Sequence, residues 1–379
     1  MRPLLLCMLV FTAAVGQVKF RAEEIQAKFG IGYAVSIEDM NRDGKPDIVA
    51  INQTQAVWFE NPSWTKHVML DGGTKKDNVC FAVNDIDGDG KPDMAIGADW
   101  QSTNTKSAGS LQWIGTKDGF QVHPLGEEPT LHRMRWGDVD GDGRKELIVL
   151  PLHGRGNART DMADASSWQG DGVRVLVYKP GADPLQPWAM EVADNTLHIT
   201  HNLIATDFDG KKGDELVIAS REGLHVLSRG KDGKWSRMKI GSGAPGEVKL
   251  GRLSKKVRAM ATIEPWHGNS VVVYREGAKG KEWAREVLDD TLTGGHALGW
   301  ADFDGDGVDD VVAGWRDKQY GLALYRLTGG KWNKEPIETG AMAAEDLAVG
   351  DLNGDGKPDI VAAGRASSNI KIYWNDGKK

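Results

Sequence analysis

Cysteine is scarce in this sequence, with two among 379 residues, Cys7 and Cys80. Cys7 lies within a short apolar stretch, residues 4–11, that follows an arginine and precedes the small residues Ala14 to Gly16. This order is typical of a secretory signal peptide, and the stretch is too short to span a bilayer. We therefore expect residues 1–16 to be removed from a secreted or periplasmic protein, in which Cys80 has no partner for an intrachain disulfide.

An excess of positive charge is missing as well. Lys and Arg number 47 against 54 Asp and Glu, which gives a net charge of -7 and an isoelectric point of about 5.8. Nucleic-acid binding is disfavoured, because phosphate contacts require a basic surface. The sequence also lacks a serine nucleophile elbow, a phosphate-binding loop and a dinucleotide fingerprint. Helical periodicity is nowhere sustained, so we expect an all-β protein with no membrane span.

What the sequence holds in quantity is a nine-residue acidic loop, each copy followed by an apolar, β-branched run. Five copies begin at Asp39 (DMNRDGKPD), Asp85 (DIDGDGKPD), Asp138 (DVDGDGRKE), Asp302 (DFDGDGVDD) and Asp351 (DLNGDGKPD). A sixth, at Asp207, has Lys211 in place of its third acid, and a segment at Gly251 fills one more register without acids. Consecutive starts lie 44 to 69 residues apart, a period that indicates a repeat array of seven units.

The acidic loops have the composition of calcium sites. Carboxylate or amide oxygens at loop positions 1, 3 and 5, with glycine at position 6, match the way proteins hold Ca2+. An EF-hand would need an acid at position 12, which here lies in the apolar run, so we expect β-turn calcium sites instead. Turn formation alone also favours Asp, Asn and Gly, but five aligned copies favour metal, and Lys211 predicts an empty fourth loop. The predicted calcium ligands are Asp39, Asn41, Asp43, Asp47, Asp85, Asp87, Asp89, Asp93, Asp138, Asp140, Asp142, Glu146, Asp302, Asp304, Asp306, Asp310, Asp351, Asn353, Asp355 and Asp359.

A second periodicity predicts how the chain closes. Six units end in an aromatic residue followed five positions later by an apolar one, as in Trp64 to Met69, and the last unit lacks this segment. Phe20 to Ile25, near the start of the chain, has the same spacing. We predict a seven-bladed β-propeller of four-stranded blades as one domain, residues 17–379, in which the N-terminal strand completes the last blade and removes two exposed sheet edges. In the first unit the expected strands are 33–38, 47–51, 56–60 and 64–69.

One repeat position, six residues before the loop, differs between units. It holds His132, His201, His296 and Glu345 in four units, and Tyr33, Val79 and Pro245 in the others. A lone histidine is more often a core residue, but in a propeller this position starts the innermost strand, so these four side chains should converge on the axis. Three imidazoles and a carboxylate suit Zn2+ or Mn2+, with room for a substrate oxygen.

Further polar residues should share the face of these histidines. The first and second strands of a unit are antiparallel, so the start of one and the end of the other lie together, opposite the acidic loops. Any single arginine at a strand end is most simply a solvated surface group, yet several such residues gather at this end. Those at or beyond the second strand are Trp100, His153, Arg155, Arg221, Trp266, His267, Arg316 and Arg365.

This set of side chains suits a polyhydroxylated ligand. Tryptophan stacks on the apolar face of a sugar ring, and arginine binds hydroxyl, carbonyl or carboxylate oxygens. A neutral histidine, either His153 or His267, could remove a proton next to a carbonyl polarised by the metal, which leads to β-elimination. We therefore expect a carbohydrate lyase, with Arg221, Arg316 and Arg365 as substrate clamps. The alternative is a propeller that binds carbohydrate or protein without chemistry; in either case we expect a monomer.

The acidic loops resemble FG-GAP/VCBS repeats, as found in integrin α propellers. The stretches 131–143 (LHRMRWGDVDGDG), 151–156 (PLHGRG), 263–268 (IEPWHG) and 345–366 resemble the propeller domain of the aldos-2-ulose dehydratase/isomerase family. The resemblance implies dehydration of 2-keto sugars such as 1,5-anhydrofructose, with His132, His153, His267, Glu345 and Arg365 at the matching positions. The cupin domains associated with isomerisation in that family have no counterpart in this sequence, so we expect no isomerase activity.

Overall fold

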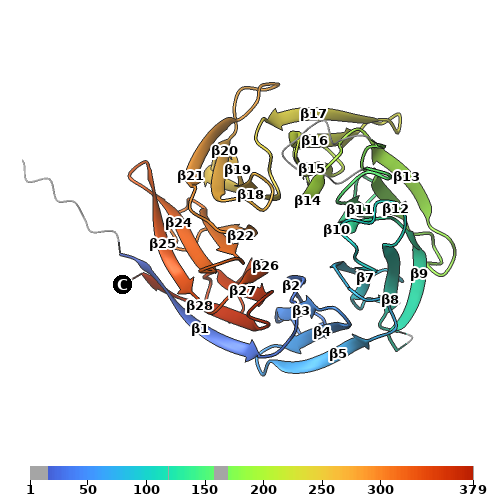
Figure 1. Ribbon diagram of the computed structural model, residues 1–379, viewed down its shortest axis with the longest axis horizontal. Helices are drawn as coiled ribbons and strands as arrows, with labels where there is room; N and C mark the ends of the chain where they lie inside the picture. The colour runs from blue at the N-terminus through green and yellow to red at the C-terminus, as the bar shows by residue number, and fades with distance from the viewer. Residues whose placement is uncertain (1–15, 118, 158–169, 379) are drawn as a thin grey trace, which may run out of the picture.

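Seven four-stranded antiparallel sheets stand radially around a central axis in the computed structural model, which describes residues 16–117, 119–157 and 170–378 (Figure 1). The predicted seven-bladed β-propeller is therefore confirmed. The predicted signal peptide lies outside the described residues except for Gly16. Within the described residues, no helix has the length and apolar character needed to cross a membrane.

Each blade uses its strands in chain order from the axis outward, and blade 7 alone borrows one from the start of the chain. The innermost strands are β2 (Ala34–Glu38), β6 (Cys80–Asn84), β10 (Leu131–Gly137), β14 (Thr200–Thr206), β18 (Glu247–Ser254), β22 (Gly295–Ala301) and β26 (Ala344–Gly350). The second strands are β3 (Asp47–Ile51), β7 (Asp93–Ala98), β11 (Glu146–Pro151), β15 (Glu215–Ser220), β19 (Val257–Glu264), β23 (Asp310–Trp315) and β27 (Asp359–Gly364). The third strands are β4 (Gln55–Glu60), β8 (Ser110–Gly115), β12 (Val175–Lys179), β16 (Gly223–Arg229), β20 (Ser270–Arg275), β24 (Gly321–Thr328) and β28 (Ile370–Lys378). The outermost strands are β5 (Thr65–Asp71), β9 (Gln121–Glu127), β13 (Ala189–Asp194), β17 (Trp235–Gly241), β21 (Ala284–Asp289), β25 (Lys331–Thr339) and β1 (Val18–Gln26).

The core lies between adjacent blades, where the second strands are covered on both faces. Every residue of β3, β7, β11, β15 and β27 is buried, which explains why these runs are apolar without alternation. The outer strands behave differently: four consecutive residues of β17 are exposed. Burial thus decreases from the second strand outward, and the blades pack on one another through their middle strands.

The N-terminal strand closes the ring. β1 pairs antiparallel with β28, with Phe20 opposite Asn375 and Glu23 opposite Ile372, and Figure 1 shows the two strands side by side although they come from opposite ends of the chain. The ring of Phe20 packs edge-on against Phe303 of blade 6, with centroids 5.8 Å apart. The predicted completion of the last blade by the N-terminal segment is confirmed.

The acidic loops join the innermost strand to the second strand at one end of the ring. Their position-6 glycines all have positive φ, for example 83° at Gly44 and 87° at Gly90, which explains the need for glycine there. The position-9 acid ties each loop to its blade: Asp47 accepts hydrogen bonds from the amides of Met40 and Asn61, both at 2.9 Å. The starts of the innermost strands and the ends of the second strands lie at the other end of the ring.

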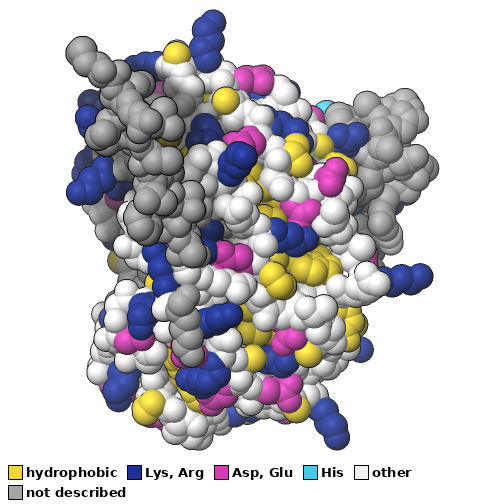
Figure 2. Space-filling view, turned by 90° about the vertical axis from the view of Figure 1, so that its left-hand side faces the viewer, with side chains coloured by type: hydrophobic (Ala, Val, Ile, Leu, Met, Phe, Trp, Pro, Cys, Tyr) yellow, Lys and Arg dark blue, Asp and Glu magenta, His cyan; other side chains and the backbone are white. Residues whose placement is uncertain are grey.

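Charges of both signs are mixed on the side of the ring. Figure 2 shows Lys and Arg interspersed with Asp and Glu on the side that it presents, with only small apolar areas between them.

Candidate functional site

The four residues singled out at one repeat position all lie at a β-bulge. The pairing of β10 with β11 shifts at His132, and the same shift occurs at His201 in β14, at His296 in β22 and at Glu345 in β26. The start of the innermost strand in the three other blades shows no such shift. A bulge leaves one residue outside the ladder and redirects its side chain, and here it turns these four toward the channel.

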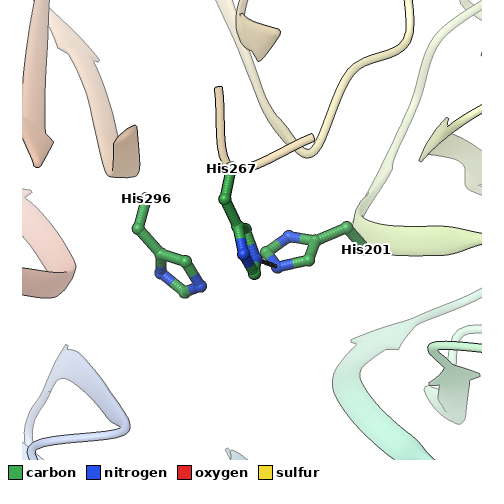
Figure 3. A group of neighbouring side chains, drawn as sticks. All are labelled: His201, His267 and His296. Carbon is green, nitrogen blue, oxygen red and sulfur yellow. Dashed lines mark hydrogen bonds between the residues drawn. The ribbon is translucent and has the colours of Figure 1, made fainter. Parts of the chain in front are cut away.

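Three histidines form the closest group. The candidate ligand nitrogens of His201, His267 and His296 all lie within 4.8 Å of one another. Figure 3 shows the His201 and His267 rings meeting edge-on with His296 beside them; the Nε2 atoms of His201 and His267 are 2.5 Å apart. His267 comes from the connection between β19 and β20, and the other two come from the bulges of innermost strands.

Hydrogen-bond partners assign the tautomers of these rings. His201 donates from Nδ1 to the carbonyl of Gly246 at 3.1 Å, and His296 donates from Nδ1 to the carbonyl of Glu345. Their Nε2 lone pairs are therefore available within the group. His267 differs, because Nη2 of Arg316 donates to its Nδ1 at 3.1 Å and so favours the proton on Nε2, which donates to His201.

His132 is held apart from the trio. Its Nδ1 donates to the carbonyl of His201 at 2.9 Å, and its Nε2 accepts a hydrogen bond from Nη1 of Arg133 at 3.0 Å. Both ring nitrogens thus have protein partners. The geometric metal candidate is consequently His201, His267 and His296, rather than the predicted set of His132, His201, His296 and Glu345.

All four histidines are neutral near pH 7. Burial is the main cause that lowers the pKa of each well below its usual value. Nearby cations act in the same direction: Arg133 lowers the pKa of His132 and His201, and Arg316 lowers that of His296. Neutral imidazoles are the form that can bind a metal or accept a proton.

Glu345 is engaged by two arginines. Its carboxylate accepts from Nη1 of Arg316 at 2.5 Å and from Nη1 of Arg365 at 2.8 Å, and its side chain is only 4% exposed. The structure therefore places Glu345 as the anchor that orients two guanidinium groups. The side chain of Arg365 remains 39% exposed, so part of its donor fork faces the opening.

The connection that carries His267 is held firmly. Trp266 has a positive φ of 53°, an unfavourable backbone conformation for a residue with a large side chain. Glu264, at the end of β19, accepts from Arg285 at 2.7 Å and from the Tyr274 hydroxyl at 2.6 Å. These bonds at the base of the turn keep Trp266 and His267 pointed at the channel.

These residues surround a cavity of about 290 Å³ at the end of the ring opposite the acidic loops. Trp100 lies over His132, with ring centroids 5.0 Å apart, and Trp266 stacks on His153 at 5.9 Å. His201 lies beneath His267 and is 1% exposed. The lining residues are Tyr33, Val79, Trp100, Ser102, His132, Arg133, Leu152, His153, Trp266, His267, His296, Arg316, Glu345 and Arg365.

Two predicted substrate-binding residues do not line this cavity. Arg155 forms an ion pair with buried Glu128 at 2.7 Å, and Arg221 follows β15, where its amide donates to the carbonyl of Ile199. The insertion in unit three that contains His153 and Arg155 is only partly described, because residues 158–169 are outside the described part. All other predicted catalytic and substrate-binding residues line the cavity or, as His201, support it.

Sequence reasoning missed a buried layer beneath the histidines. Oε1 of Glu247 lies 3.0 Å from Nδ1 of His201, Oε2 of Glu247 accepts from Asn202, and Arg133 lies 3.7 Å from Glu247. A signal was present, because Arg133 and Asn202 directly follow two of the bulged histidines. Buried polar side chains in such strands require hydrogen-bond partners.

The acidic loops differ in how their carboxylates are already paired. Acid clusters able to hold a cation occur in blades 2, 3, 4 and 6. In blade 3, Lys179 reaches Asp142 at 2.7 Å, Glu146 at 3.3 Å and also Asp140. In blade 6, Asp304 pairs with Arg326 at 2.8 Å and with Lys378 at 3.2 Å. Lys211 pairs with Asp209 in blade 4, and exposed lysines pair with Asp43 in blade 1 and Asp355 in blade 7. Among the described residues, five loops therefore have a cation supplied by the chain itself.

Comparison with protein families agrees with the resemblance seen in the sequence. Residues 106–277 match the model of the aldos-2-ulose dehydratase β-propeller domain. Residues 39–96 and 302–362 match the FG-GAP-like repeat. The first match spans the segments that carry His132, His153, His201 and His267. The second contains the acidic loops of blades 1, 2, 6 and 7.

Individual relatives support a related propeller. Aldos-2-ulose dehydratase of Phanerodontia chrysosporium is 26% identical over 332 residues, which cover 77% of this chain and 35% of that protein. The chain thus spans about a third of the length of this curated relative. Among solved structures, the WD40 repeats of RRP9 (TM-score 0.58) and virginiamycin B lyase from Staphylococcus aureus (TM-score 0.57) each share 12% identity and cover 94% of this chain and 99% of their own. At that identity they show the fold alone.

Proposed function

We propose that the protein is a carbon–oxygen lyase of the sugar dehydratase type that performs β-elimination on a keto-sugar or an oxidised glycoside. The observation that carries this proposal is the convergence of neutral histidines, three arginines and two tryptophans on one cavity, in a chain related to a dehydratase propeller. The cavity of about 290 Å³ is of the size of one sugar ring, so the ligand would be a monosaccharide unit.

The trio of His201, His267 and His296 fits a transition metal, Zn2+ or Mn2+, in its donor type and spacing. Two of the rings donate Nδ1–H to backbone carbonyls, which is how proteins orient histidine ligands. Binding through His267 would require its proton to leave Nε2, against the present donation from Arg316. A cation held there would polarise the substrate carbonyl and stabilise an enolate.

The chain's own residues supply the remaining steps. Trp100 and Trp266 would cover the apolar face of the sugar ring, and Arg365 with Arg316 would bind its carbonyl oxygen. His153 lines the cavity outside the trio, and we assign it as the base. It takes the proton from the carbon next to the carbonyl while the electron pair moves to the carbonyl oxygen, where the arginines stabilise the charge. The electron pair then moves back from the carbonyl oxygen to form a carbon–carbon double bond, and the C–O bond at the next carbon breaks. The leaving oxygen takes a proton and departs as water or alcohol.

A second candidate function is carbohydrate binding without chemistry. Arg316, His267, His201 and Gly246 form a continuous hydrogen-bond chain that satisfies these rings with no ion. Such a self-contained arrangement would serve a rigid binding site equally well.

The deciding experiment incubates the purified protein with 2-keto and 3-keto sugars and glycosides and follows enone absorbance, with metal content measured in parallel. The lyase proposal expects enone formation and one transition-metal ion per chain, both lost in His201→Ala and retained in His123→Ala, a histidine variant on outer strand β9. Sugar binding without enone from any of these compounds would instead establish the second candidate.

We also propose that the chain is exported and that acidic loops bind Ca2+. Export is supported by the sequence of residues 1–16, and calcium by the loop composition and by glycines held at positive φ. Expression in a secreting host with N-terminal sequencing tests the first point, and the expected mature protein starts at Gln17. A secreted protein that retains Met1 would contradict cleavage.

A further inference from the structure

The end of the channel nearer the acidic loops contains a second cavity, of about 460 Å³. Its walls are the whole of β2 and parts of β6, β10 and β26, together with Lys249 of β18 and Lys145 of an acidic loop. Trp136 forms part of the wall and is fixed by donation from its Nε1 to the carbonyl of Ala82 at 3.2 Å. This cavity shares no lining residue with the histidine cavity among the described residues.

Three cations, Arg135, Lys145 and Lys249, and two carboxylates, Glu38 and Asp346, line this second cavity. Arg135 donates to the carbonyl of Met134 at 2.7 Å and to Oδ1 of Asn202 at 3.1 Å, which fixes its guanidinium. The ammonium group of Lys249 forms no hydrogen bond, and no ion pair within 4.0 Å, with any residue in the described ranges, although the charges of Asp346 and Glu247 act on it from farther away. Such an unpaired cation inside a channel is costly, because an ammonium group loses hydration there.

Asp346 supplies an acceptor near Arg135 and Lys249. Its two oxygens accept hydrogen bonds from the amides of Val35 and Leu347, both at 3.0 Å. A carboxylate has about four acceptor sites, so each oxygen can still accept one more hydrogen bond. Burial, followed by the charge of Arg135, lowers the pKa of Lys249, while burial raises that of Asp346. A ligand that forms hydrogen bonds with both groups would therefore offset their loss of hydration.

We propose that the second cavity is a binding site for a small hydroxycarboxylate, such as a sugar acid. The ligand carboxylate would lie between Arg135 and Lys249, a ligand hydroxyl would donate to Asp346, and the carbon chain would lie along Trp136 and Ala82. A single negative charge fits best. A phosphate dianion would meet Asp346 and also Glu38, which lines the same cavity.

A buried polar layer separates this site from the histidine cavity. Arg133, Asn202 and Glu247 are each at most 6% exposed and lie between the two ends of the channel. Asn202 contacts both sides of the layer, because it accepts from Arg135 and donates to Glu247, so substitutions at both ends of the channel are compared in the test. The second site would bind its ligand whether or not the histidine cavity is catalytic.

The test is calorimetric titration of the full-length protein with gluconate, and with neutral glucitol, which has the same chain without the carboxylate. We expect gluconate to bind and glucitol not to bind. Lys249→Met should weaken gluconate binding by about tenfold or more, the effect of losing one charge-assisted contact, while Lys249→Arg retains it. Arg365→Ala, at the opposite end of the channel, should leave the gluconate affinity unchanged.

Three results would overturn the site: no binding of gluconate to the wild-type protein, equal binding of glucitol, or binding that Arg365→Ala abolishes and Lys249→Met does not. Thermal melts confirm that each variant is folded. If Lys249→Met does not fold, Ala82→Leu takes its place, because it narrows the cavity without removing a charge. Gluconate binding that is unchanged in Ala82→Leu would also reject the site.

Discussion

Each histidine of the candidate site depends on a particular neighbour. His201 is the clearest case: it is 1% exposed, and its Nδ1 faces both the Gly246 carbonyl at 3.1 Å and Oε1 of Glu247 at 3.0 Å. The hydrogen bond to Gly246 fixes the tautomer of the ring, and the Glu247 carboxylate acts on the ring through its nearby charge. Glu247 touches neither the cavity nor a substrate, so it is a positioning residue for His201.

Replacing Glu247 by glutamine keeps its shape and removes its charge. We expect Glu247→Gln to lower kcat about 10- to 100-fold with little change in KM, and to weaken transition-metal binding by a similar factor. Enone formation and metal titration measure these effects. Glu286→Gln, an outer-strand carboxylate paired with Arg275, is the matched control. A variant with normal kcat and metal affinity would show that Glu247 has only a structural role.

Buried neutral histidines also govern the response to acid. His225 in β16 is remote from both cavities, and burial lowers its pKa to about 4. In the unfolded chain it would titrate near its usual value of about 6.5. Below that pH the unfolded state binds a proton that the folded state does not bind. The free energy of unfolding therefore decreases as the pH falls from about 6.5 toward 4. Carboxylates with raised pKa, such as Glu247, act in the opposite direction.

We therefore expect His225→Gln to reduce the loss of stability between pH 7 and pH 5 by about 1–2 kcal/mol. Urea unfolding at several pH values measures it. The same difference between wild type and variant at every pH would contradict this assignment of the proton.

At the scale of elements, the strands could be predicted and the bulges could not. The acidic loops mark turns, the unbroken apolar runs mark strands buried on both faces, and the aromatic spacing marks outer strands. Together these local patterns predicted seven blades and their closure. The bulges at His132, His201, His296 and Glu345 are visible in the sequence only as unusual residues at one repeat position. Glu247 lies two residues from that position in the fifth unit, where the position itself is Pro245 and not a histidine, so repeat comparison could not reveal that Glu247 lies beside His201.

The loops are elements that share a sequence pattern but differ in their partners. Lys179 at the end of β12 places its ammonium group among Asp140, Asp142 and Glu146 of blade 3. A cation from the chain and a calcium ion would compete for these oxygens. Lys211 was recognised from its own loop, whereas Lys179 lies 37 residues beyond Asp142, and only the fold shows their contact.

We expect Lys179→Met to bind one more Ca2+ than the wild-type protein, because the substitution frees the oxygens of the blade 3 loop. Equilibrium dialysis with metal analysis measures the stoichiometry. Lys357→Met is the control, since Lys357 contacts Asp355 of its own loop from the exposed surface at 2.9 Å. An unchanged count in Lys179→Met would mean that the lysine does not exclude calcium.

Strand β1 is the element that joins the two ends of the chain. Removing residues 17–27 would expose the edge of β28, an unpaired strand that favours association with other chains. We expect this deletion to lower the melting temperature and to cause aggregation, and a synthetic peptide of residues 17–27 to restore both. Size-exclusion chromatography and thermal melts follow the result. A deletion protein that stays monomeric and equally stable would show that the pairing contributes nothing.

At the scale of the whole molecule, the ring separates two chemistries at its two ends. Histidine, arginine and tryptophan gather at one end and aspartate-rich loops at the other, and this division follows from the antiparallel order of strands within each blade. The loops fix the connections between innermost and second strands in several blades at once. Their effect on stability should therefore be felt by the whole ring.

We expect chelation to lower the melting temperature by several degrees. Each site saturated at about 100 times its Kd contributes about 2.7 kcal/mol to the folded state. Differential scanning calorimetry with and without EDTA measures the shift, and EDTA saturated with calcium beforehand is the control. Identical melting curves in both would contradict structural calcium in the loops.

The pairing of β1 with β28 also sets an order of events during protein synthesis. The ribosome produces β1 first and its partner last, so six blades and part of the seventh are made before the first strand can find its place. Until the final residues emerge, the growing chain has two unpaired sheet edges, and its first strand has no partner to pair with. A pause, a truncation or premature release near the C-terminus would therefore leave an open, adhesive arc instead of a slightly shortened ring.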